Sequence, residues 1–176
     1  MDNPEFEPFE DLSRYPVQDE KRERMFAEQL ECSVVWTTSD GWPVGVIQWF
    51  VWRDSRIWVT THTRRKRLSA FRARPETCVI VSSCGTSLGP AQTVTVKTRA
   101  TVHTDQQTKD WFHRALADKA YPHDAEYREF FHRMLHETDR VVIELDPVQW
   151  ISYDAMRMHA DIQSSDIRVT APEDHT

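Results

Sequence analysis

Residues 57–75 read Ile57-Trp-Val-Thr-Thr-His-Thr-Arg-Arg-Lys-Arg-Leu-Ser-Ala-Phe-Arg-Ala-Arg-Pro75. The β-branched and aromatic start predicts a strand that ends at Thr60 and Thr61, followed by a short helix over about 64–73. Four consecutive cations, Arg64 to Arg67, fall in the first turn of that helix, beside backbone N–H groups that have no helical partner. Hydroxyl, N–H and cationic groups in one place are what a bound phosphate requires. The segment therefore predicts an anion site formed by Thr60, Thr61, Arg64, Arg65 and Lys66.

The charge of this region differs from that of the whole chain. Residues 53–74 contain eight Lys or Arg and one Asp, a local net charge of +7, whereas the chain of 176 residues has a formal net charge of −6. A solvated helix face would mix both signs. Cations at a helix N-terminus also oppose the helix dipole unless an anion lies among them. The pattern favours an anion site over a solvated basic helix.

The overall composition argues against several classes of protein. The net negative charge disfavours a general nucleic-acid binder, for which a basic domain is typical. No apolar run approaches the 18 residues of a membrane-spanning helix. The first residues are acidic where a signal peptide would be basic and then apolar. We therefore expect a cytoplasmic protein that binds neither nucleic acid nor membrane.

Seven short strands are predicted, with tight turns such as Ser39-Asp-Gly-Trp42 between them. Their expected ranges are 33–38, 43–52, 57–61, 77–84, 93–103, 140–145 and 149–153. Further helices are expected over about 18–31, with Asp19 as N-cap, and over 105–118 and 123–137. Because no helix separates the strands between 33 and 61, the pattern does not fit a doubly wound parallel sheet. It predicts a mainly β (α+β) fold, a small closed β-barrel with peripheral helices.

One domain accounts for most of the chain. We expect residues 17–158 to form a single barrel domain, preceded by a flexible arm over 1–16 and followed by a polar C-terminal tail over 159–176. The arm contains Phe6 and Phe9, which are candidates for packing on a partner subunit.

Gln48 lies in the predicted strand 43–52, where period-2 alternation places it on one face with Val46, Phe50 and Trp52. A primary amide among apolar groups needs a hydrogen-bond partner. Two partners are open at this stage: the edge of a bound heteroaromatic ring, or a neighbouring part of the backbone.

No second site stands out in the sequence. His132 and His136 are four residues apart on a predicted helix, but neither an H-E-x-x-H pattern nor a third ligand accompanies them, so no metal site is expected. Cys32, Cys78 and Cys84 form no C-x-x-C pair and are expected to be ordinary thiols. The Gly-x-Ser-x-Gly motif of a serine hydrolase is absent from the sequence.

These features together resemble the flavin phosphate-binding segment of the pyridoxamine 5′-phosphate oxidase-like, FMN-binding split-barrel superfamily. In that segment an aromatic strand ends in Thr-Asn or Thr-Thr, and Ser-Arg-Lys precedes a helix that ends at Asn-Pro or Asp-Pro. Thr60-Thr61 matches the strand end, Arg65-Lys66 the Arg-Lys pair and Arg74-Pro75 the helix exit. The resemblance extends over about residues 20–155.

The resemblance implies a six- or seven-stranded split β-barrel and a homodimer with two cofactor clefts at the subunit interface. The isoalloxazine ring would lie along Val46 to Gln48 with Val59 to Thr61 beside it, and Arg65 and Lys66 would hold the phosphate. Trp150 or Arg157 would contribute across the interface. The implied cofactor-binding residues are Val46, Ile47, Gln48, Val59, Thr60, Thr61, Arg64, Arg65, Lys66 and Trp150.

The implied function is a flavin-dependent oxidoreductase that binds FMN and transfers hydride to or from a small organic substrate. The catalytic residue is unknown, because nothing ranks Tyr153, His62 or Arg99 as a proton donor.

Some residues depart from the pattern of the family. Arg64 stands where the oxidases have serine, and Val44 and Trp49 replace a cationic pair of the true oxidases, which argues against a vitamin B6 oxidase. An alternative is a reductase that uses the deazaflavin coenzyme F420, whose anionic tail would suit the extra Arg64, Arg67 and Arg72. A further alternative is a non-enzymatic flavin- or haem-binding protein.

Overall fold

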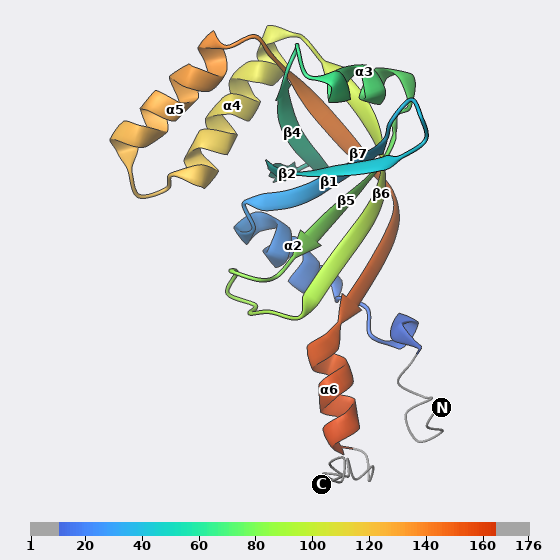
Figure 1. Ribbon diagram of the computed structural model, residues 1–176. Coiled ribbons are helices and arrows are strands. Elements are labelled where there is room, and N and C mark those ends of the chain that lie inside the picture. Colours follow the sequence, from blue (N-terminus) through green and yellow to red (C-terminus); the bar gives the residue numbers. More distant parts are fainter. Residues whose placement is uncertain (1–10, 165–176) are drawn as a thin grey trace, which may run out of the picture.

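The computed structural model of the chain describes residues 11–164 (Figure 1). The strands are β1 (Glu31–Thr37), β2 (Pro43–Trp49), β3 (Val51–Arg53), β4 (Arg56–His62), β5 (Glu76–Ser82), β6 (Gln92–His103) and β7 (Arg140–Asp154). The helices are the 3-10 turn η1 (Leu12–Arg14), α2 (Asp19–Glu28), α3 (Lys66–Ala73), α4 (Gln106–Ala120), α5 (Ala125–Glu137) and α6 (Ala155–Ser164). The strands form one curled sheet that dominates the fold, which confirms the predicted α+β class and the split barrel.

The antiparallel sheet has the strand order β2-β1-β5-β6-β7-β4-β3. β2 and β3 follow each other in the chain yet lie at opposite edges of the sheet, so the sheet curls until its edges approach each other. Phe50, the residue between them, is fully buried and donates its backbone N–H to the Leu30 carbonyl at 3.0 Å. The prediction of one strand over 43–52 is therefore wrong, because burial of Phe50 ends the pairing with β1 and redirects the chain.

β7 is one strand of 15 residues, where the sequence predicted two. Thr98 of β6 pairs with Pro147, and Lys97 pairs with Gln149, so Val148 is left as the extra residue of a β-bulge. Proline has no N–H to donate to the ladder, and a bulge accommodates this locally. The sequence 146–148 therefore bends the strand instead of ending it.

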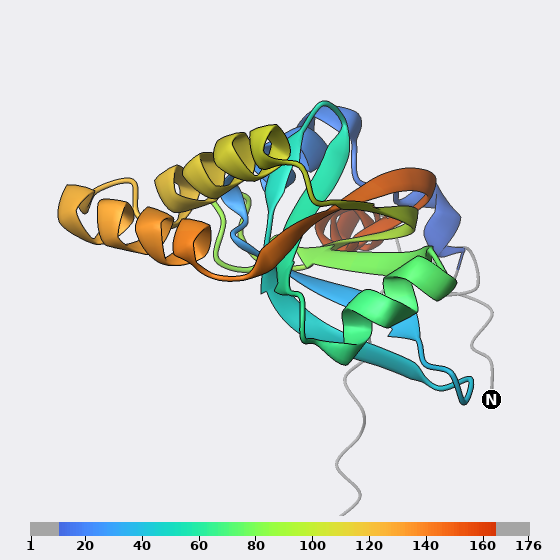
Figure 2. The same ribbon diagram turned by 90° about the horizontal axis from the view of Figure 1, so that it is seen from above.

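Two apolar cores hold the elements together. The inner core fills the barrel and includes Met25 and Phe26 of α2. The second core lies between the α4–α5 hairpin and the outer face of the sheet, where Phe112 and Leu135 pack with Trp58 of β4. β4 is therefore covered on both faces. Figure 2 shows the hairpin projecting to one side of the barrel.

The first described residues and α6 lie at the end of the barrel away from α3 (Figure 1). Tyr15 is buried, and its carbonyl accepts the backbone N–H of Asp154 at 2.8 Å. The buried Asp154 carboxylate accepts a hydrogen bond from Lys21 Nζ at 3.0 Å and from two backbone N–H groups in the first turn of α6. The last residue of β7 is thereby held by the preceding segment of the chain, and α6 is capped.

These contacts change part of what we expected for the two ends. Residues 11–16 pack against β7 and are not loose, and residues 159–164 belong to α6. Phe6 and Phe9, and the tail from residue 165, lie outside the described residues. At the start of α2 the N-cap is Gln18 and not Asp19. No helix within residues 11–164 is long and apolar enough to cross a membrane.

Candidate functional site

The turn between β4 and α3 is the centre of the predicted anion site. α3 begins at Lys66, two residues later than expected, with Arg65 in an extended conformation at its N-cap. Three hydrogen bonds explain the later start of the helix. Thr63 donates its N–H to the Asp139 carbonyl and its hydroxyl to the Asp139 carboxylate, and the Arg65 N–H bonds to the carbonyl three residues earlier. The chain is thus tied to the start of β7 until residue 65, and only then becomes helical.

The cations of this turn have no acidic partner in the part of the chain that the structure describes. Arg64, Arg65 and Lys66 are exposed, and none of them forms an ion pair with a carboxylate of residues 11–164. The N–H groups at the start of α3 add a positive partial charge, because a first helical turn lacks intrahelical acceptors. An anion would therefore meet an unneutralised positive surface.

Arg140 is a fourth cation of this site that the sequence did not reveal. It is the first residue of β7 and pairs with His62, the last residue of β4. Burial, and then the nearby charge of Arg65, hold the pKa of Arg140 below its usual value. The pairing of two strands about 75 residues apart in the chain creates this neighbourhood, so no local motif could have predicted it.

Arg67 is directed into the protein and not towards the exposed surface where an anionic cofactor tail would bind. Its Nε donates to the Thr61 hydroxyl at 2.7 Å, and the side chain is partly buried. Burial lowers the pKa of Arg67, and the charges of Arg65 and Arg140 lower it further. Each of its three nitrogens donates to a group of the protein, which argues against the expected role of Arg67 in binding an anionic tail.

Gln48 has protein partners for its amide. In the orientation that satisfies both ends of the amide, Nε2 donates to the Thr60 carbonyl at 3.0 Å and Oε1 accepts from both terminal nitrogens of Arg67 at 2.9 and 3.0 Å. Of the two partners left open by the sequence, the structure therefore supplies a backbone neighbour, together with an arginine. A bound ring is not needed to satisfy Gln48.

The hydroxyls of Thr60 and Thr61 are both used in the structure. Thr60, which faces the α4–α5 side of β4, donates to the Val141 carbonyl at 2.9 Å. Thr61 faces the barrel interior and accepts from Arg67, which leaves its own proton free. Both residues are buried. They therefore support the turn from below and do not belong to its exposed surface.

The remaining predicted residues do not line one surface within a single chain. Val59 is buried in the barrel and Val46 packs at its rim, whereas Ile47 is 61% exposed on the outer face of the sheet. Trp150 packs against Phe26 and Trp52 with ring centroids 5.9 and 6.2 Å apart. Trp150 lies eight residues along β7 from Val142, which pairs with Thr60 of β4. In an extended strand this separation is roughly 26 Å.

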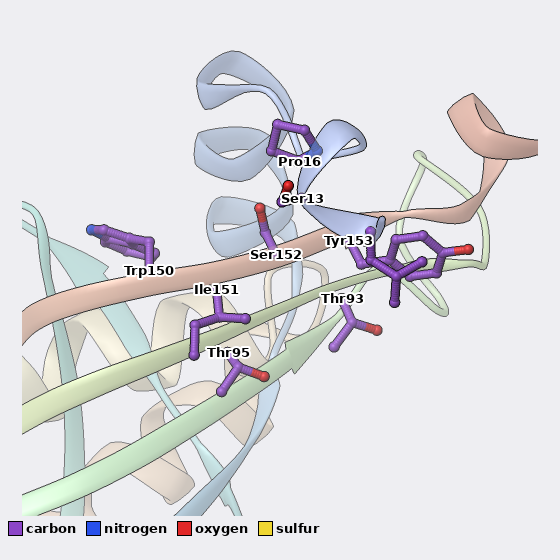
Figure 3. Close-up of a pocket in the computed structure, with 9 residues that line it drawn as sticks. Ser13, Pro16, Thr93, Thr95, Trp150, Ile151, Ser152 and Tyr153 are labelled. Carbon is purple, nitrogen blue, oxygen red and sulfur yellow. The ribbon is translucent and has the colours of Figure 1, made fainter. Parts of the chain in front are cut away.

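Trp150 instead borders a cleft at the other end of the barrel (Figure 3). The cleft has a volume of about 430 Å³. Figure 3 shows Pro16 and Ser13 over β7, with Trp150 and Tyr153 set apart along the strand. Arg157 donates to the Pro16 carbonyl at 2.9 Å beside it. Within one chain, therefore, neither Trp150 nor Arg157 reaches the turn before α3.

Of the three side chains considered as proton donors, His62 alone belongs to this turn. Its Nδ1 accepts the Arg64 N–H at 3.4 Å. The Tyr153 hydroxyl donates to Met158 Sδ at 3.1 Å, and Arg99 pairs with Glu76 at 3.1 Å. His62 is the residue to test first if a proton is transferred at the turn.

The α4–α5 hairpin contains a buried titratable group that the sequence analysis missed. His113 is 1% exposed, and neither ring nitrogen has a hydrogen-bond partner among the described residues. Burial, followed by the charges of His136, Arg140, His132 and Lys109, lowers the pKa of His113 to about 4. Between residues 11 and 164 no three His, Cys, Asp or Glu side chains are grouped as metal ligands.

The fold defines the class of protein, a split barrel, and in this chain a group of exposed cations stands at the start of α3. The chain belongs to the pyridoxamine 5′-phosphate oxidase family, whose model matches residues 19–154. This match confirms the resemblance seen in the sequence.

Solved structures show the same fold. A conserved hypothetical protein of Mycobacterium tuberculosis matches 89% of this chain and 95% of its own, with a TM-score of 0.67 and 16% identity. An F420 reductase matches 73% and 94% of the two chains, with a TM-score of 0.57 and 20% identity. An FAD-binding protein of Mesorhizobium loti matches 77% and 91%, with a TM-score of 0.55 and 15% identity. A comparison with curated proteins gave no match.

Proposed function

We propose that the protein is a flavin-dependent oxidoreductase that holds the phosphate of FMN at Arg65 and Lys66 and transfers hydride to or from a small organic substrate. The observation that carries this proposal is the unneutralised group of cations at the start of α3. A phosphate dianion would relieve the repulsion between these cations and accept hydrogen bonds from free N–H groups. Membership of the pyridoxamine 5′-phosphate oxidase family supports a flavin as the carrier of that phosphate.

The residues of this chain would bind and orient the cofactor. When bound, the flavin would supply the hydride chemistry itself. Arg65 offers a planar pair of donors for two phosphate oxygens, whereas Lys66 offers a mobile point charge. β4 is covered on both faces and gives the turn a rigid base.

Coenzyme F420 is the second candidate, and an excess of positive charge favours it. Arg64, Arg65, Lys66 and Arg140 bring four charges to the turn, whereas a phosphate monoester carries at most two negative charges. A cofactor with further carboxylates along its tail would neutralise more of them. The fold is also similar to that of an F420 reductase, although at 20% identity this shows the fold alone.

The absorption spectrum of the purified protein tests which cofactor it binds. We expect flavin bands, or flavin bands after addition of FMN and removal of the excess, and bleaching of these bands when a reductant such as NADPH is added without oxygen. Uptake of F420 in place of FMN would select the second candidate. A Soret band would indicate haem, and a bound flavin that no nicotinamide or substrate extract reduces or reoxidises would count against an enzyme.

We also propose that two copies associate through the outer face of the sheet. The strand register places Ile47, Ile80 and Ile151 in one row across β2, β5 and β7, with Ser33 and Thr95 between them. The three isoleucines are 61, 37 and 50% exposed. An apolar row of this kind on an open sheet face is typical of an interface. A symmetric dimer would bury the row against its own copy.

A charge in this row should separate the dimer. We expect Ile80→Glu to shift the mass measured by light scattering from two chains to one at micromolar concentration, because each copy would then bury a carboxylate in the interface. Phe130→Glu on α5 is the matched control, since Phe130 is 51% exposed away from the row. If the wild-type chain is already monomeric, the dimer proposal is wrong.

A further inference from the structure

We infer that Gln48 and Arg67 form a latch across the split of the barrel and position the phosphate-binding turn without touching the phosphate. The inference rests on the proposed function for the identity of the ligand, and on hydrogen bonds between three elements for its geometry. β2 contributes Gln48, β4 contributes Thr60 and Thr61, and α3 contributes Arg67.

The split of the barrel lies between β2 and β4. β2 pairs with β1 along its length, and β3 covers β4 only as far as Trp58. From Val59 onward β4 is paired on one side only, with β7. The Gln48 amide donates to the Thr60 carbonyl at 3.0 Å and therefore makes, with a side chain, the link that a strand ladder would otherwise make here.

Arg67 completes the latch from the helix. Its Nε bonds to the Thr61 hydroxyl at 2.7 Å, and both of its terminal nitrogens bond to Gln48 Oε1. No carboxylate among residues 11–164 pairs with Arg67, so these two neutral acceptors are what stabilises a partly buried cation. Without Gln48 the guanidinium would be left partly desolvated and short of acceptors, which is costly.

The position of Arg67 in α3 explains why the latch matters for the ligand. Arg67 is the second residue of α3, directly after Lys66 and two residues after the N-cap Arg65. The later part of α3 is held separately, because Leu68 and Phe71 are buried and Phe71 packs on Trp36 at 5.7 Å. The first turn, which carries the cations for the phosphate, is joined to the end of β4 by the bond from the Arg65 N–H to the His62 carbonyl, and the side chain of Arg67 adds the connection to β2 and to Thr61.

The test compares Gln48→Leu, which removes both acceptor and donor, with Gln48→Glu, which keeps acceptors for Arg67. Thr98→Val is the control, because it removes the buried 2.7 Å hydroxyl contact between Thr98 and Thr77 away from the split. The dissociation constants of FMN and of glycerol 3-phosphate, a phosphate monoester without a ring, are measured well below the melting temperature of every variant. Hydrogen exchange of the Leu68 amide, which bonds to the Arg65 carbonyl, reports the first turn without ligand.

We expect Gln48→Leu to weaken binding of both ligands by about tenfold and to speed Leu68 exchange. Gln48→Glu keeps an acceptor for Arg67 but cannot donate to the Thr60 carbonyl, so it should restore most of both readouts but not all. Thr98→Val should lower the melting temperature and leave affinities unchanged. If Gln48→Leu weakens FMN but not glycerol 3-phosphate, Gln48 contacts the flavin ring and the latch is wrong. The latch is also wrong if Gln48→Leu changes neither the two affinities nor Leu68 exchange. If the wild-type protein binds neither ligand, the proposed function fails, and Leu68 exchange alone decides whether the latch holds the turn.

Discussion

Replacing Arg65 and Lys66 together with alanine should weaken FMN binding by about 100-fold or more, because each substitution removes at least one charge-assisted hydrogen bond to the phosphate. The change leaves the barrel intact, since both side chains are exposed and neither contributes to the apolar cores. Quenching of FMN fluorescence on binding measures the affinity. The single variants should each show a smaller loss, and the losses should shrink at high salt because exposed charges are screened.

Arg72→Ala is the matched control for this experiment. Arg72 lies in the last turn of the same helix, is exposed, and carries the same charge as Arg65. Its loss should change FMN affinity by less than about threefold, as expected for a charge that acts only at a distance. Equal effects of Arg72→Ala and Arg65→Ala would show that the ligand responds to net charge and not to the turn.

Acid should destabilise the folded protein through His113. The pKa of His113 is about 4 in the folded protein, whereas a histidine of the unfolded chain has its ordinary pKa of about 6.5. Above pH 6.5 both states are neutral and stability is unaffected. As the pH falls from 6.5 towards 4, the unfolded chain gains the proton and the folded protein does not, so the free energy of unfolding drops, by about 3 kcal/mol at most.

Urea unfolding of wild type and His113→Phe at pH 7.5 and 4.5 measures this effect. The loss of stability between the two pH values should be smaller in the variant by about 2 kcal/mol. At pH 4.5 the contribution of His113 has not yet reached its maximum of about 3 kcal/mol. His113→Leu serves as a second variant if the larger ring does not fit, and His123→Gln, at an exposed position of the α4–α5 turn, is the control. Parallel losses in wild type and both His113 variants would rule out the buried imidazole as the cause.

The parts of the fold that the sequence predicted are those with local signals. The run Ile57–Thr61 and the helix that ends before Pro75 are defined by residues close together in the chain, and both appear where expected, with α3 shortened at its start. The break at Phe50 and the single strand β7 were missed because both depend on pairing over long distances. The alternation of residues 43–52 does not reveal that Phe50 is needed in the core beside Phe26.

The site shows the same division between local and distant signals. Arg65 and Lys66 are adjacent in the sequence and were found from it, whereas Arg140 joins them only through the register of β4 and β7. The amide of Gln48 was recognised as needing a partner, but its partners Thr60 and Arg67 come from two other elements. His113 gave no signal, because a histidine in a predicted helix is usually solvated.

The affinities of FMN and riboflavin test most directly whether a flavin is held by its phosphate at the turn before α3. Riboflavin has the same ring and ribityl chain as FMN but lacks the phosphate. Titrating both into the wild-type protein under the same conditions should give an affinity for FMN at least about 100-fold higher, as expected for several charge-assisted hydrogen bonds to one group. Equal affinities for the two, or no binding of FMN, would contradict the account.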